Sequence, residues 1–241
     1  MTSLTDLITC AHGLADASGK VILPHFRTAL AIDNKARSGF DPVTIADTAA
    51  EKTIRSALAK QYPDHGIIGE EFGTSDGVSR YRWIIDPIDG TRAFMMGLPL
   101  WGTLIGVLDK ETPVVGMMDQ PFTQERFWAG SRGGAHYRRG DGKLQRLTTR
   151  KTSALETAIL AATTPDMFQS RAEKAGFSRV SKRVRMTRFG GDCYAYCLLA
   201  AGYIDIIAEG GLKPYDIVAL IPIIEAAGGR ITCWDGGPAE A

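Results

Sequence analysis

The stretch that most constrains this chain is Trp83-Ile84-Ile85-Asp86-Pro87-Ile88-Asp89-Gly90-Thr91. Its apolar start predicts a buried strand, which we expect to stop at Asp86-Pro87 because proline cannot donate to a sheet ladder. Two carboxylates, Asp86 and Asp89, stand three residues apart, and Gly90 permits a tight turn before the hydroxyl of Thr91. Carboxylates at the end of a buried strand are costly unless a positive charge meets them. The stretch therefore predicts either a site for a hard divalent cation such as Mg2+ or a surface turn made of ordinary turn residues.

Composition and charge restrict the class of protein. The chain has 241 residues, of which 44% are hydrophobic and 23% charged, and a net charge of +1. These values are typical of a globular protein and give no basic field that would favour nucleic acid. We see no apolar run long enough for a membrane and no signal peptide. The four cysteines are widely spread, and we interpret them as reduced core thiols of a cytoplasmic protein.

The pattern of apolar residues predicts a mixed α/β chain. In the first half it predicts helices over about residues 4–26 and 44–62, a loop or hairpin over 31–39, a strand over 66–69, a helix starting at 92–96, and an antiparallel meander over 104–108, 114–118, 126–129 and 135–138. In the second half, strands over 158–162, 183–186, 204–208 and 230–233 alternate with helices over 165–175, 193–201 and 217–227. We interpret residues 1–241 as one domain of layered helices and sheets, with a meander half to about residue 147 and an alternating half from about residue 148.

Further acids stand at the ends of the predicted elements. Glu70 directly follows the strand over residues 66–69, and Asp47 and Asp216 lie at helix starts. Each has an ordinary alternative role. Asp47 comes three residues after Thr44 and fits a capping box, whereas Glu70 fits a solvated strand end.

Taken together, these pieces resemble the magnesium-dependent inositol monophosphatase family. The resemblance covers about residues 41–229 and is carried, in the order and spacing of the family, by Asp-Pro-Val-Thr-Ile-Ala-Asp at 41–47, Gly-Glu-Glu at 69–71, the stretch at 83–91, Gly-Gly-Asp at 190–192 and Pro-Tyr-Asp at 214–216. It implies the layered αβαβα sandwich of the inositol-monophosphatase and fructose-bisphosphatase type, usually assembled as a homodimer.

The resemblance also implies a metal-dependent phosphatase site. One Mg2+ would be held by Glu70, Asp86 and the carbonyl of Ile88, a second by Asp86, Asp89 and Asp216, and a third, weaker ion would lie near Glu70. The attacking water would lie between Glu70 and Thr91, with Asp47 orienting the Thr91 hydroxyl. The backbone amides of Gly90 and Thr91 would bind the phosphate oxygens of a small-molecule phosphate monoester.

Other segments bear on the substrate. The segments Gly-Thr-Arg-Ala-Phe at 90–94, Arg-Phe-Gly-Gly-Asp-Cys-Tyr-Ala-Tyr at 188–196 and Leu-Lys-Pro-Tyr-Asp at 212–216 look most like the histidinol-phosphate phosphatases of this family. Asp192, next to Gly191, and Glu209 would then face the alcohol, amine or imidazole of the substrate, since acids suit cationic groups. Arg188 would shape the pocket or touch phosphate. The alternatives are a helix N-cap for Asp192 and a surface strand end for Arg188.

We therefore predict a Mg2+-dependent histidinol-phosphatase of histidine biosynthesis. One alternative keeps the chemistry and changes the substrate to inositol 1-phosphate or another sugar or nucleotide phosphate. An alternative of another class is a regulatory member of the fold that binds RNA or protein. The complete set of proposed metal and catalytic residues argues against that alternative, because a binding module has no need of it. The near-neutral charge also argues against RNA as the main partner.

Overall fold

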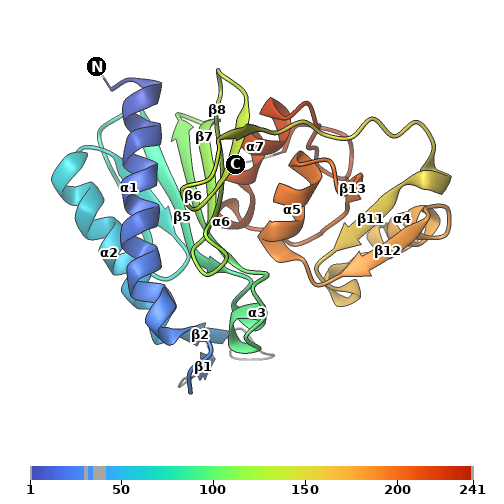
Figure 1. Ribbon diagram of the computed structural model, residues 1–241, viewed down its shortest axis with the longest axis horizontal. Coiled ribbons are helices and arrows are strands. Elements are labelled where there is room, and N and C mark those ends of the chain that lie inside the picture. Colours follow the sequence, from blue (N-terminus) through green and yellow to red (C-terminus); the bar gives the residue numbers. More distant parts are fainter. Residues whose placement is uncertain (1, 30–31, 35–41, 240–241) are drawn as a thin grey trace.

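The computed structural model of the protein describes residues 2–29, 32–34 and 42–239. Its elements lie in successive layers of helix, sheet, helix, sheet and helix (Figure 1). Helices α1 (Leu4–Ile22) and α2 (Ile45–Gln61) cover one face of the large sheet. Helix α7 (Leu220–Ala226) packs on the other face. The predicted α/β class and layered sandwich are confirmed.

The large sheet has eight strands in the order β10-β9-β8-β7-β6-β5-β3-β4. Its strands are β3 (Gly66–Gly69), β4 (Gly73–Ser75), β5 (Tyr81–Asp89), β6 (Gly102–Asp109), β7 (Thr112–Gln120), β8 (Glu125–Gly130), β9 (Ala135–Arg139) and β10 (Gln145–Arg146). Strands β6 to β9 form the predicted antiparallel meander, which β5 and β10 extend at its two sides, whereas β3 runs parallel to β5. A separate antiparallel pair joins β1 (Ile32–Asn34) to β2 (Pro42–Thr44). The loop or hairpin predicted over 31–39 falls mostly outside the described residues.

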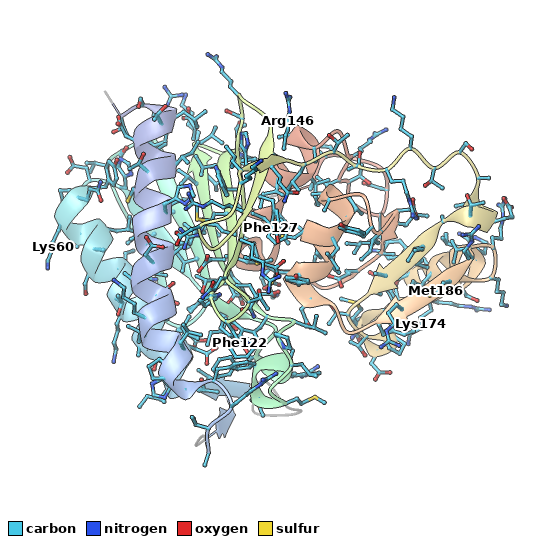
Figure 2. All side chains as sticks on the ribbon, in the orientation of Figure 1. Lys60, Phe122, Phe127, Arg146, Lys174 and Met186 are labelled. Atoms are coloured by element: carbon cyan, nitrogen blue, oxygen red, sulfur yellow. The ribbon has the colours of Figure 1, made fainter. Side chains whose placement is uncertain are left out.

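The alternation of side chains along β6 builds a core on each side of the large sheet. Ile105 and Val107 pack in the cluster beneath α1 and α2, while Leu104 belongs to the cluster beneath α7. Phe127, on β8, belongs to that second cluster and is labelled in Figure 2. A Cβ at Gly116 would lie 1.9 Å from the carbonyl oxygen of Ala219. Glycine is therefore required where the start of α7 approaches β7.

The second half supplies a three-stranded parallel sheet and the helices around it. The elements are β11 (Ile159–Ala162), α4 (Arg171–Ser181), β12 (Met186–Phe189), α5 (Asp192–Ala200), β13 (Ile206–Ile207) and α6 (Pro214–Ile217). Helix α3 (Thr91–Met95) and 3-10 turns at Leu23–His25, Leu155–Thr157 and Pro165–Met167 complete the described chain. In Figure 1, α5 lies between the two sheets and α4 lies at the outer end of the molecule.

Several predicted boundaries in the second half are wrong. The helix expected over 165–175 is a 3-10 turn followed by α4, which begins where the Ser170 hydroxyl and Glu173 form a capping box. Because α4 runs to Ser181, the strand expected over 183–186 is displaced to β12. The helix expected over 217–227 is divided, since the ring of Pro222 would collide with the carbonyl of Val218 in a continuous helix.

Three further expectations are corrected. The strand expected over 204–208 has only two residues, Ile206 and Ile207. The strand expected over 230–233 is reduced to a single bridge between Thr232 and Pro238. Three of the four cysteines are buried free thiols as expected, but Cys233 is half-buried in the turn near Pro238.

Among the described residues, no helix combines the length and the apolar character that crossing a membrane requires.

Candidate active site

The parallel pairing of β3 with β5 brings Glu70 next to Asp86. Gly69 lies opposite Ile85 in this pair, and the N–H of Glu70 donates to the carbonyl of Ile85 at 3.2 Å. Glu70, which follows the last residue of β3, therefore lies beside Asp86 on β5. The sequence predicted both acids at strand ends, and the register shows why they are neighbours.

The strand β5 does not stop at Asp86 as expected. It continues to Asp89, and its pairing with β6 shifts register between Asp86 and Asp89. Pro87 lies in this irregularity, which tolerates the missing N–H. The Asp86 side chain closes the turn, since its Oδ1 accepts from the N–H of Ile88 at 3.0 Å. The backbone thus presents Asp86 and Asp89 from one rigid bulge.

Gly90 ends this bulge in the left-handed region, with φ of 85°. A Cβ there would lie 3.0 Å from the carbonyl oxygen of Leu100 and 3.2 Å from the Cβ of Asp192. Both the backbone conformation and the close approach therefore require glycine. Helix α3 begins directly afterwards at Thr91, as the sequence predicted.

Three carboxylates converge on one point. Oxygen atoms of Asp86, Asp89 and Asp216 all lie within 4.8 Å of one another. Asp216 is fixed at the start of α6, where its Oδ2 accepts from the N–H of Lys213 at 2.7 Å. Asp89 is fixed by α5, since its Oδ2 accepts from the N–H of Cys193 at 2.7 Å. These are the three acids that the resemblance assigns to a second metal ion.

The electrostatics of this cluster favour a bound cation. Burial, and then the charges of Glu70, Asp89 and Asp216, raise the pKa of Asp86 well above its usual range. Burial also raises the pKa of Asp89 well above its ordinary value and that of Asp216 to about 6. Gathering these groups as anions is costly unless a positive charge offsets them. A donor set made only of carboxylate and carbonyl oxygens fits a hard divalent cation.

Asp47 makes contacts that fit both of the roles considered for it. As the third residue of α2, it forms a capping box in which its Oδ2 accepts from the N–H of Thr44 at 2.9 Å. Its Oδ1 lies 3.5 Å from Oγ1 of Thr91, which also donates to the carbonyl of Ile88 at 3.0 Å. Asp47 is fully buried, and this burial raises its pKa. One carboxylate thus joins the start of α2 to the start of α3.

A cavity of about 150 Å3 opens beside the three carboxylates. It is lined by Asp89, Thr163, Met167, Asp192, Cys193, Tyr196, Glu209, Leu212 and Asp216. Glu209 is held firmly in its wall. One of its oxygens accepts from the N–H and hydroxyl of Thr163, at 2.8 and 2.6 Å, and the other from the Tyr196 hydroxyl at 2.7 Å. The predicted substrate acids, Asp192 and Glu209, therefore lie in one cavity with two of the clustered carboxylates.

The N-cap alternative for Asp192 is wrong. The N-cap of α5 is Gly191, with no side-chain capping bond, and Asp192 is the first helical residue with φ of 42°. The carboxylate that accepts from the first turn of α5 is that of Asp89. Burial, and then the charge of Glu209, raise the pKa of Asp192 to about 6, while Arg92 opposes the shift.

The structure does not place Arg188 in the cavity lining, and sequence reasoning missed some residues that do line it. The Arg188 side chain is exposed on β12, and the described residues that line the cavity do not include it. Thr163, Met167 and Tyr196 were not predicted. The signal for Thr163 was its position directly after a parallel strand, where ligand sites of α/β sheets occur.

Known proteins resemble the whole chain. A sequence profile described as the inositol monophosphatase family matches residues 3–240. The chain is 44% identical over 98% of its length to the chloroplastic bifunctional phosphatase IMPL2 of Arabidopsis thaliana, of which it covers 66%. It is 35% identical over 96% of its length to a histidinol-phosphatase of Mycobacterium tuberculosis, of which it covers 88%.

The fold has solved relatives as well. An inositol monophosphatase from Zymomonas mobilis is 39% identical and superposes with a TM-score of 0.86, with 100% of this chain and 90% of that chain covered. Sequence and fold therefore agree, and the chain belongs to the inositol monophosphatase family, a family of phosphoric monoester hydrolases.

Proposed function

We propose that this protein is a Mg2+-dependent phosphatase of L-histidinol phosphate, which it hydrolyses to L-histidinol and phosphate in histidine biosynthesis. The observation that carries the proposal is the cavity in which Asp192 and Glu209 lie beside the three clustered carboxylates. Histidinol phosphate has an ammonium group and an imidazole next to its phosphate ester. Acidic walls beside a cation site suit a substrate with these two ends.

The residues at the strand ends have defined parts in this proposal. Glu70, Asp86 and the carbonyl of Ile88 hold one Mg2+, Asp86, Asp89 and Asp216 hold a second, and a third, weaker ion lies near Glu70. Bound there, the ions lower the pKa of water and offset charge on the phosphoryl oxygens and the leaving oxygen. Asp86 and Asp89 come from one bulge of β5, Asp216 from the start of α6 and Glu70 from the end of β3. Backbone N–H groups donate to Asp86, Asp89 and Asp216, so these acids are preorganised.

The remaining residues orient the reactants. Thr91, fixed by Asp47 and by the carbonyl of Ile88, holds the attacking water together with Glu70. The backbone amides of Gly90 and Thr91 bind phosphate oxygens. The water attacks phosphorus in line as the ester bond breaks, and the alcohol leaves with a proton. Asp192 and Glu209 bind the cationic end, Gly191 allows the substrate to approach, and Arg188 shapes the pocket or contacts phosphate.

The named relatives support this substrate without deciding it. A 35% identical relative is a histidinol-phosphatase, and a 44% identical one is a bifunctional phosphatase. A second candidate is inositol monophosphate, which is favoured by the 39% identical inositol monophosphatase of known structure. The homodimer and the cytoplasmic location remain predictions from the sequence.

The test is phosphate release with Mg2+ across four esters: histidinol phosphate, inositol 1-phosphate, a fructose bisphosphate and a nucleoside bisphosphate. We expect kcat/KM to be highest for histidinol phosphate. A flat profile, or a preference for inositol 1-phosphate, would retain the metal chemistry and overturn the substrate. Failure of folded protein to release phosphate from any of them would overturn the proposal as a whole.

A further inference from the structure

A second acid of α2 is buried one helical turn beyond Asp47. Glu51 has an exposed fraction of 0%, and neither the sequence pattern nor the resemblance gave it a role. A charged side chain at such depth requires partners for its oxygens. Those partners come from the segment that carries Glu70.

Glu51 binds the backbone that follows Glu70. Its Oε2 accepts from the N–H of Glu71 at 2.8 Å, and its Oε1 accepts from the N–H of Phe72 at 3.3 Å. Oε1 also accepts from Nε of Arg55 at 2.7 Å. One carboxylate therefore accepts from two consecutive backbone N–H groups.

Arg55 extends this support along the same turn. Its terminal nitrogens donate to the carbonyl of Gly73 and, at 2.9 Å, to the hydroxyl of Ser75. The planar guanidinium thus spans from Glu51 to the start of β4. Glu51 and Arg55 together hold the segment of residues 71–75 against α2 by hydrogen bonds.

Gly69, the residue before Glu70, has no side chain and so leaves room for the carboxylate of Glu51. A Cβ at Gly69 would lie 2.0 Å from Oε1 of Glu51, so any larger residue would displace the carboxylate. On its other side, the N–H of Glu70 is fixed to the carbonyl of Ile85 on β5. Glu70 therefore emerges between a strand partner and a buried carboxylate, with little backbone freedom.

From these contacts we infer that Glu51, held by Arg55, is a positioning residue for Glu70 and thereby for metal binding. The inference rests on the proposed function, because it requires Glu70 to be a ligand. In this inference the two buried acids of α2 have different roles. Asp47 contacts Thr91 directly, whereas Glu51, one turn further along α2, acts on Glu70 through the backbone N–H of Glu71.

The test is Glu51→Gln, which keeps the shape and removes the charge. The glutamine amide would direct an N–H group at one of the present donors and so loosen the turn. Partners of this kind change metal affinity by about 10-fold to 100-fold when they are lost. We expect a rise of about 10-fold in the Mg2+ concentration that half-saturates the thermal shift of substrate-free protein, and a similar rise for activity.

The matched control is Asp119→Asn on β7. Asp119 is 4% exposed and accepts from Nε of Arg126 at 2.7 Å, so it is a comparably buried carboxylate with the same partner type, and it belongs neither to the group of three carboxylates nor to the residues that line the cavity. Both variants should lower Tm in EDTA, but Asp119→Asn should leave the Mg2+ half-saturation unchanged. An unchanged value for Glu51→Gln, or an equal rise in both variants, would overturn the inference.

Two outcomes separate this inference from the proposed function. If wild-type protein shows neither a Mg2+-induced thermal shift nor phosphate release, the proposed function fails and the positioning role fails with it. If the wild type responds and Glu51→Gln does not differ from it, only the positioning role fails. Should Glu51→Gln not fold, Arg55→Lys decides, because it keeps the charge but loses the bonds to Gly73 and Ser75. A weaker Mg2+ response supports the inference, and an unchanged response overturns it.

Discussion

The backbone N–H of Cys193 donates a 2.7 Å hydrogen bond to Oδ2 of Asp89. This bond joins the first turn of α5 to the end of β5, through two residues that are 104 positions apart in sequence. A carboxylate has further acceptor sites after one such bond, so Asp89 can be fixed by the helix and still bind a cation. Helix α5, which carries Asp192, therefore also fixes the position of Asp89, one of the three clustered carboxylates.

The first prediction concerns the charge of Asp89. Asp89→Asn keeps an oxygen for the N–H of Cys193 but removes a negative charge from the cluster. We expect activity at saturating Mg2+ to fall by more than about 100-fold, since losing a ligand should exceed the loss of an outer partner. Tm in EDTA should rise, because like charges are relieved. Phosphate-release assays and thermal unfolding check both. Unchanged turnover at saturating Mg2+ would contradict the metal assignment.

The sequence predicted acids at strand ends and helix starts, and the family resemblance assigned Asp86, Asp89 and Asp216 to one metal site. Such positions are visible in periodicity and turn residues, and the parallel pairing of β3 with β5 then places Glu70 beside Asp86. The meander of β6 to β9 was predicted because its strands are separated by turn signals, whereas the short strands β4 and β10 were not predicted. The division of the single domain into two halves remains a prediction.

The cavity wall was harder to predict, because it depends on contacts between distant segments. Glu209 is placed by Thr163 and Tyr196, 46 and 13 residues away. The periodicity of the second half is weak, as β13 has two residues and α6 four. Local signals therefore misplaced the segment at Met167, where a 3-10 turn replaces the expected helix. Glu51 was missed because its partners are backbone N–H groups, which no side-chain motif reveals.

The second prediction is a pH dependence of metal-free stability. Burial raises the pKa of Asp216 to about 6 and that of Asp86 further above its ordinary value near 4. The folded protein then holds protons that the unfolded chain has released, so this stabilisation is complete below about pH 4 and is lost as the pH rises through about 6 and above. Bound Mg2+ removes the cost of the anionic forms.

We therefore expect the Tm difference between Mg2+ and EDTA to be small at about pH 5 and large at about pH 8. The difference is the appropriate quantity, because His12, with its pKa lowered to about 4 by burial, changes stability in the opposite direction in both conditions. Thermal unfolding across this range measures it. A Tm difference that is independent of pH would show that the carboxylates do not titrate together with metal binding.

The third prediction separates the two roles of Asp47. Thr91→Val removes the hydroxyl that lies 3.5 Å from Oδ1 of Asp47, whereas Thr91→Ser retains it. We expect kcat to fall by about 10-fold to 100-fold for the valine variant and to stay near wild type for serine. Asp47→Asn should lower kcat similarly and cost about 1 kcal/mol or less of folding free energy through its capping box.

The control for Asp47 is Asp6→Asn. Asp6 forms the same capping box with Ser3 at the start of α1, where its Oδ2 accepts from the N–H of Ser3 at 2.9 Å. This variant should lower Tm slightly and leave kcat unchanged. If Asp47→Asn behaved like Asp6→Asn, with full kcat, Asp47 would be a capping residue only.

The last prediction concerns Asp192 as the group that recognises a cation. Asp192→Asn is the suitable variant, because asparagine tolerates the φ of 42° at this position. It removes a charge that faces the cavity shared with Glu209. Hydrogen bonds to charged groups contribute about 1.5–3 kcal/mol, so kcat/KM for histidinol phosphate should fall by about 10-fold or more. The value for an aryl phosphate that carries no cationic group should change little. Arg188→Ala, on the exposed strand β12, tests in the same assay whether Arg188 shapes the pocket or contacts phosphate. Equal losses on both substrates for Asp192→Asn would mean that Asp192 shapes the site without reading the charge of the substrate.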